Sequence, residues 1–116
     1  MAGKNNTINY VEFNVSDIEA SKAFYGTVFG WQFKDYGPQY CEFSDGNMTG
    51  GFTTTAPVKA EGGALVILYA DNLEPTLEAV KKAGGTIVEY IFEFPGGRRF
   101  HFRDLDGYEL AVWTAN

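Results

Sequence analysis

Residues 15–31 read VSDIEASKAFYGTVFGW, and this stretch predicts the end of a strand followed by a helix. The residues before it alternate in polarity from Ile8 to Val15, which is the period of a strand. Ser16 and Glu19 then form an S-x-x-E capping box, typical of a helix start. Apolar residues follow at helical spacing until Gly30, which suits the residue just after a helix end. The chain therefore begins its fold with a β-α unit.

The rest of the chain extends this unit and then repeats it. Three strands are expected after the helix, near Trp31–Tyr36, Tyr40–Ser44 and Met48–Thr54. The second half predicts a strand at Ala64–Ala70, a helix from an Asp71 N-cap to Gly84-Gly85, and strands near Thr86–Phe92, Arg99–Arg103 and Tyr108–Thr114. Val11, Glu19 and Gly30 align with Val66, Glu74 and Gly85. We interpret this as an internal duplication within one domain, residues 1–116, with modules at about 7–55 and 63–115.

Composition excludes several classes of protein. The net charge of −6 makes nucleic acid an unsuitable partner, because phosphate binding needs clustered cations. No apolar run is long enough to predict a membrane span. The polar start, Met1–Thr7, lacks the apolar region of a signal peptide, and the single cysteine cannot form an internal disulfide. We therefore expect a cytoplasmic protein.

Several motifs, taken in order, resemble those of the vicinal oxygen chelate superfamily, which includes glyoxalases, bleomycin resistance proteins and extradiol dioxygenases. They are Val15–Glu19, Ala23–Tyr25, Val28–Trp31, Val80–Gly85 and Phe102–Gly107. The resemblance implies an α+β fold in which two βαβββ modules form a curled, eight-stranded sheet shaped as a cup. It also implies a homodimer, which the unpaired sheet edges of each half favour as well.

Metal-dependent members of this superfamily hold an ion at symmetric cup positions. By the resemblance, these positions are Tyr10, Gly50, Leu65 and Ala111. Three of the four have no donor side chain, so we expect neither a metal nor any other cofactor. A one-residue shift brings in only apolar side chains: Val11, Val66, Leu110 and Val112. A two-residue shift brings in Glu12 and Glu109, which could hold a weak hard cation but lack an evident third ligand.

Strand alternation predicts which side chains line the cup. The candidate catalytic residues are Glu12 and Glu109, either of which could act as a general base or be a solvated rim carboxylate. The candidate ligand-binding residues are Tyr10, Asn14, Ile67, Tyr69, Trp113 and His101. His101 could also be a general acid or a surface residue. Arg99 and Arg103 could hold an anion or be solvated, and Cys41 is expected to be an inert thiol.

Three functions remain open from the sequence. The first is a glyoxalase-like protein that binds a small organic ligand in the cup without metal. The second is a lyase or isomerase that uses Glu12 or Glu109 as its base. The third is a non-catalytic subunit or scaffold, whose cup would be filled by its own side chains. Metal-dependent lactoylglutathione lyase activity is not expected, because the metal polarises the reacting oxygens in that reaction.

Overall fold

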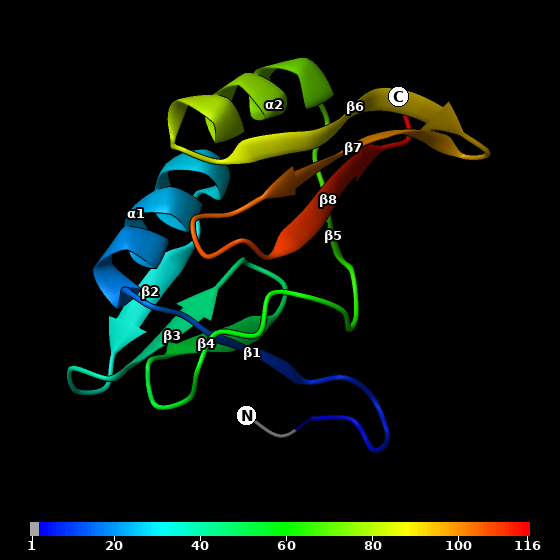
Figure 1. Cartoon of the computed structure of the whole chain (residues 1–116). Helices are drawn as coiled ribbons and strands as arrows, with labels where there is room; N and C mark the ends of the chain where they lie inside the picture. Colours follow the sequence, from blue (N-terminus) through cyan, green and yellow to red (C-terminus); the bar gives the residue numbers. More distant parts are fainter. Residues whose placement is uncertain (1–2) are drawn as a thin grey trace. The chain divides into compact units, whose positions relative to one another are not determined.

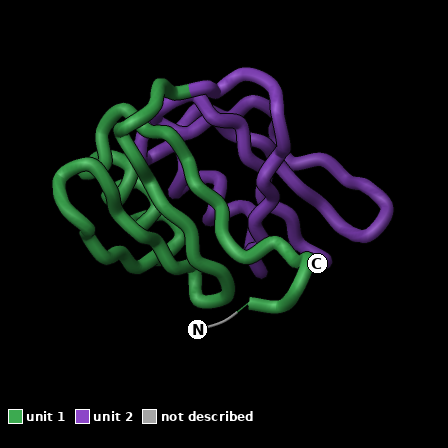
Figure 2. Tube along the Cα trace, turned by 90° about the horizontal axis from the view of Figure 1, so that it is seen from below, with its two compact units in different colours: residues 1–58 green, residues 59–116 purple. Residues whose placement is uncertain are grey.

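A computed structural model describes residues 3–116. Met1 and Ala2 lie outside the described residues. They belong to the polar start, Met1–Thr7, from which no signal peptide is expected. The chain forms two compact units, residues 1–58 and 59–116, which are coloured separately in Figure 2. Each unit has the order β-α-β-β-β that the sequence predicts. All eight predicted strands are present, arranged as two four-stranded mixed sheets.

Unit 1 consists of one helix and one sheet. Its elements are β1 (Tyr10–Asn14), α1 (Ile18–Phe29), β2 (Gln32–Asp35), β3 (Tyr40–Ser44) and β4 (Thr49–Thr53), labelled in Figure 1. The strand order is β1-β4-β3-β2, so β1 and β2 are the edge strands. β1 is parallel to β4, and the other pairs are antiparallel. The first strand of the unit therefore lies beside the last.

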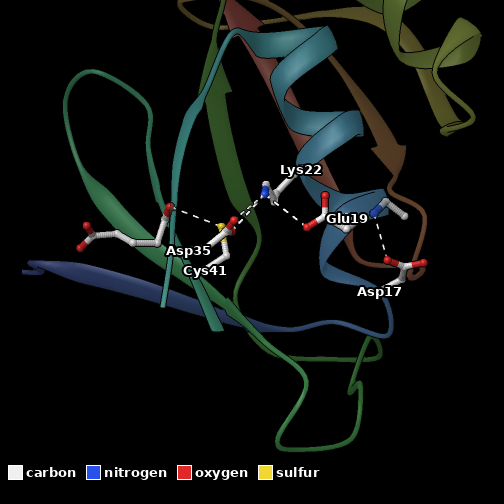
Figure 3. Close-up of polar contacts among 7 residues, drawn as sticks. Asp17, Glu19, Lys22, Asp35 and Cys41 are labelled. Carbon is white, nitrogen blue, oxygen red and sulfur yellow. Dashed lines mark hydrogen bonds and ion pairs between the residues drawn. The ribbon is translucent and has the colours of Figure 1, made fainter. Parts of the chain in front are cut away.

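The start of α1 differs from the capping box expected at Ser16. Asp17 is the N-cap, and its carboxylate accepts a hydrogen bond from the Ala20 amide at 3.1 Å. Figure 3 shows this contact, together with Lys22, which forms ion pairs with Glu19 and Asp35. The helix ends as predicted at Gly30, which has φ 73°, a left-handed conformation that glycine adopts without strain.

Aromatic rings form the core of unit 1. Tyr25 on α1 stacks on Trp31 with ring centroids 4.6 Å apart, and Trp31 stacks on Phe43 at 4.5 Å. Phe52 on β4 is fully buried against Tyr25 and Phe43. Phe13 on β1 contacts the same group. These contacts place α1 on one face of the sheet and leave the other face to Tyr10, Glu12 and Tyr40, which we call the open face of unit 1.

Unit 2 repeats the arrangement. Its elements are β5 (Val66–Tyr69), α2 (Leu73–Lys82), β6 (Thr86–Phe94), β7 (Gly97–Arg103) and β8 (Glu109–Thr114) (Figure 1). The strand order is β5-β8-β7-β6, with β5 parallel to β8. The N-cap of α2 is Asn72, so the expected cap at Asp71 is wrong by one residue. Within residues 3–116, neither helix is long and apolar enough to cross a membrane.

The sheet of unit 2 also has two faces. Phe100, Phe102, Leu110 and Val112 are buried on the side of α2. The alternate positions form the open face of unit 2, which carries Ile67, Tyr69, Arg99, His101 and Trp113. The edge strand β6 departs from regular pairing with β7 between Ile87 and Glu89 and again between Glu89 and Phe92. Such bulges bend an edge strand and hinder its pairing with another chain.

Candidate functional site

A hydrogen-bonded chain of two phenols and a carboxylate lies on the open face of unit 1. The Tyr40 hydroxyl donates to Glu12 Oε1 at 2.9 Å and lies 2.6 Å from the Tyr10 hydroxyl. A phenol has one proton, so Tyr10 must be the donor to Tyr40 when Glu12 is ionised. Burial raises the pKa of Tyr40, and its hydrogen bonds with Tyr10 and Glu12 raise it further. The lone pairs of the Tyr10 oxygen stay available to a ligand that donates hydrogen bonds.

Gly51 makes this network possible. It lies opposite Glu12 in the pairing of β1 with β4. A Cβ at this position would overlap the Tyr40 hydroxyl and would lie 2.9 Å from the Tyr10 hydroxyl. The Gly50-Gly51 pair is therefore a point of close approach inside a strand. Asn14 lies at the end of β1 opposite Thr53 and is half-buried.

The four positions at which the superfamily holds a metal do not fit a divalent ion. Gly50 pairs with Val11, and a Cβ there would overlap the Phe43 ring, so it points away from the face that carries Tyr10. Gly50 and Tyr10 were expected to line the same face of the cup. They lie on opposite faces of the sheet, which is an error of one residue in the strand register. Leu65 and Ala111 in unit 2 have no donor atoms. Across residues 3–116, no three His, Cys, Asp or Glu side chains gather in a way that could hold a metal.

A histidine–carboxylate pair lies on the open face of unit 2. His101 on β7 and Glu109 on β8 approach to 2.8 Å between Nδ1 and Oε2. An ionised carboxylate only accepts, so in the neutral histidine the proton is on Nδ1 and Nε2 keeps its lone pair. Nε2 is buried and has no hydrogen-bond partner among the described residues. Glu109 therefore orients an imidazole whose basic nitrogen is not used by the protein.

A pocket of about 360 Å³ adjoins this pair. Its walls come from the loop at residues 60–65, from the end of β7 and from the start of β8. Leu65 contributes apolar surface, Arg103 a cation and Glu109 a carboxylate. The loop is held to the wall because the Lys59 amide donates to the Tyr108 hydroxyl at 3.3 Å. A pocket with apolar surface and a few converging polar groups is typical of a small-molecule site.

An aromatic surface continues along the same face beyond the pair. Trp113 contacts Tyr69 edge-on at 5.1 Å and Phe94 at 6.2 Å between ring centroids. Tyr69 and Ile67 are 50% and 43% exposed, which is high for apolar side chains on a sheet. Arg99 lies opposite Trp113 in the pairing of β7 with β8. The predicted ligand-binding residues of unit 2 thus share one face.

Cys41 has the properties of an inert thiol. It is fully buried in β3, and burial raises the pKa of its thiol, which lowers the fraction of reactive thiolate. Its Sγ lies 3.5 Å from the Glu42 carbonyl, and Figure 3 shows it near Asp35. Asp35 also raises the pKa of the thiol, and the nearby Lys22 ammonium lowers it by less than burial raises it.

Sequence reasoning missed two functional features. Tyr40 was assigned only to a strand, although its hydroxyl joins Tyr10 to Glu12. Phe92 and Phe94 were not connected with Arg99, although both rings lie within 6 Å of its guanidinium carbon. Assignment to a strand could not reveal the neighbours of Tyr40, because those depend on pairing between distant strands.

Comparison with known proteins agrees with this architecture. The chain is 24% identical over 95% of its length to "Putative glyoxylase CFP32" of Mycobacterium bovis, of which it spans 46%. Solved structures with the same fold include a glyoxalase-related enzyme from Fulvimarina pelagi, with TM-score 0.80 and 20% identity over 94% of this chain and 88% of that one. The fosfomycin resistance protein FosX from Mesorhizobium loti has TM-score 0.79 and 18% identity over 96% and 93%. A family model matches residues 7–112, and the chain belongs to the Glyoxalase/Bleomycin resistance protein/Dioxygenase superfamily.

Proposed function

We propose that this glyoxalase-family chain binds a small organic ligand, without a metal ion, in the pocket of unit 2. The observation that carries the proposal is the pocket of about 360 Å³ whose wall includes Glu109, itself bonded to His101. Arg103 and Leu65 in the same wall would contact a charged group and an apolar group of the ligand. The volume suits a molecule of modest size rather than a macromolecule.

The test is a screen of small organic molecules against the ¹⁵N-labelled chain by NMR. A ligand of the pocket should shift the backbone amides of residues 61–65 and 107–109. Leu65→Trp should block this binding by filling the pocket, since Leu65 is part of its wall. Leu105→Trp is the matched control, because Leu105 is 45% exposed and does not line the pocket. The proposal would be contradicted if no compound shifted the amides of residues 61–65 and 107–109. It would also be contradicted if the shifts caused by a compound persisted in Leu65→Trp.

Metal independence is tested separately. We expect the protein, after incubation with Ni²⁺, Zn²⁺, Mn²⁺ or Fe²⁺ and dialysis, to retain far less than one ion per chain. The reason is that three of the superfamily's four ligand positions have no donor side chain and the fourth, Tyr10, offers only a phenol. One ion bound per chain, with a matching rise in melting temperature, would refute this part of the proposal.

The His101–Glu109 pair favours a second candidate function, proton-transfer catalysis of the lyase or isomerase type. Glu109, which lines the pocket, would take a proton from a carbon acid, leaving the electron pair on the substrate, while its hydrogen bond with His101 Nδ1 holds the carboxylate in place. The sequence-based hypothesis also makes Glu109 the base, and the contact adds His101 as the group that orients it.

The experiment follows deuterium exchange at carbon in molecules that bind the pocket, by NMR in D₂O. Glu109→Gln should slow exchange by roughly 10²–10⁴-fold, and His101→Gln should slow it by less. Glu12→Gln, which alters the carboxylate of unit 1, should leave it unchanged. Exchange that is equally fast in Glu109→Gln would exclude this role. Binding without exchange in the unmodified chain would favour ligand binding alone.

We also propose that the chain forms a homodimer. The edge strand β6 exposes 38% of Val88 and 64% of Tyr90. Large exposed apolar side chains favour association through side-chain contacts, while the bulges of β6 hinder only strand-to-strand pairing. Light scattering coupled to size exclusion should give twice the chain mass of 12.8 kDa. A monomer at micromolar concentration would contradict the proposal.

A further inference from the structure

Two neighbouring arginines of β7 have contrasting environments. Arg98 donates to Glu74 at 2.7 Å and to the Asn116 carbonyl at 3.1 Å. Arg99 forms no ion pair with any described residue, and its Nε is buried without a hydrogen-bond partner. A half-buried guanidinium that lacks both a counter-charge and a partner for a buried N–H is energetically costly.

The surroundings of Arg99 are aromatic. Its guanidinium carbon lies 5.5 Å from the centroid of Phe92 and 5.6 Å from that of Phe94, within the range of cation–π attraction. These rings hold the planar group in place but supply no acceptor for its N–H bonds. Of the carboxylates on the neighbouring strands, Glu109 is bonded to His101. Glu93 and Glu89 lie opposite Arg98 and His101 in the pairing of β6 with β7, and neither forms an ion pair with Arg99. The positive charge of Arg99 is thus oriented but not neutralised.

An apolar surface lies next to this cation. Trp113 is opposite Arg99 across the pairing of β7 with β8, and Tyr69 leans on Trp113 from β5. Tyr69 and Ile67 expose about half of their surface on the same face. A planar anion with an apolar ring could therefore meet both features at once, with its charged end on the guanidinium and its ring on Trp113.

From these contacts we propose that the open face of unit 2 holds an organic carboxylate, with Arg99 binding the carboxylate and Trp113 and Tyr69 contacting the ring. Arginine suits this role because its N–H groups match the two oxygens of a carboxylate, and surrounding apolar groups strengthen the contact. This site is separate from the pocket at Leu65 and Arg103, and it stands whether or not that pocket binds a ligand.

Sodium benzoate is the probe, and its neutral amide, benzamide, is the matched control. Titration into the ¹⁵N-labelled chain should shift the Arg99 Nε–H and Trp113 indole N–H signals with saturation. We expect benzamide to bind at least ten-fold more weakly, because it lacks the charge. Benzamide binding as tightly as benzoate would overturn the proposal, as would the absence of saturable shifts. Inorganic phosphate that binds more tightly than benzoate would refute the carboxylate assignment.

Variants separate this site from the pocket. Arg99→Gln should weaken benzoate binding by at least ten-fold, and Arg99→Lys should weaken it less, since charge remains without the planar fork. Arg98→Gln is the neutral control and should leave benzoate binding within two-fold, because Arg98 lies on the alternate position of β7 and is bonded to Glu74. Loss of benzoate binding in Arg103→Gln, but not in Arg99→Gln, would refute the assignment to Arg99. The benzamide comparison needs no variant, so it decides the question even if Arg99→Gln folds poorly.

Discussion

Gly51→Ala should disrupt the hydrogen-bonded chain on the open face of unit 1. The new methyl group would overlap the Tyr40 hydroxyl and lie 2.5 Å from its Cζ, so the phenol must swing away. That movement breaks the bonds of Tyr40 to Glu12 and Tyr10, at 2.9 and 2.6 Å. The substitution therefore tests whether the missing side chain of Gly51 positions Tyr40.

The cost of Gly51→Ala follows from these two contacts. Losing one neutral hydrogen bond and one to a partly exposed carboxylate is worth about 2–3 kcal/mol. Replacing glycine in a strand also reduces the entropy of the unfolded chain, and this raises the free energy of unfolding by about 0.5–1 kcal/mol. The free energy of unfolding should therefore fall by about 1–2.5 kcal/mol.

Urea unfolding at 25 °C, followed by circular dichroism, measures this change. Tyr40→Phe is the matched variant, since it removes the hydroxyl and both bonds without adding a methyl group. Combining the two substitutions should cost less than the sum of the single effects, because the bonds can be lost only once. The reasoning would be refuted if the free energy of unfolding of Gly51→Ala lay within about 0.3 kcal/mol of that of the unmodified chain. It would also be refuted if the effects of Gly51→Ala and Tyr40→Phe on this free energy were strictly additive.

Four further outcomes are expected. The raised pKa of Tyr40 means that the network's stabilisation is complete below the ordinary tyrosine pKa of 10.0 and is lost as the pH rises through the higher folded value. Alkaline melting curves should therefore differ between the unmodified chain and Tyr40→Phe. Arg98 lowers the pKa of Glu74, so this ion pair stabilises the fold above the unfolded pKa of the carboxyl and is lost as the pH falls. An NMR titration of the Glu74 carboxyl should show the lower pKa, and Arg98→Gln should return it towards 4.5. Cys41 should not react with a thiol reagent until urea unfolds the chain, since it is fully buried. Phe52→Ala should cost about 3–5 kcal/mol in urea unfolding, because it removes a fully buried ring.

The local pattern of the chain predicted elements better than it predicted their ends. Gly30 ends α1 as expected, because left-handed backbone at a helix end strongly favours glycine. The N-caps are Asp17 and Asn72, one residue after the expected Ser16 and Asp71. Neighbouring polar residues can all cap a helix, and the path by which the chain enters the helix selects among them.

The composition of the candidate site was also largely predictable. Alternation correctly grouped Ile67, His101 and Trp113 on one face, since successive side chains of a strand point to opposite sides. The prediction failed at Gly50, where a one-residue error in register exchanged the two faces of β4. Glycines have no side chain to bury, so their own chemistry could not reveal this error.

The sequence by itself determined two β-α-β-β-β units and a set of expected metal positions without metal donors. Both follow from local periodicity and from the side-chain chemistry of single residues. Only the tertiary structure decided that Tyr40 lies over Gly51 and that His101 meets Glu109. It also decided that Arg99 lies over aromatic rings and forms no ion pair within residues 3–116. These contacts join residues on different strands, and the register of those strands is set by packing of the whole sheet against its helix.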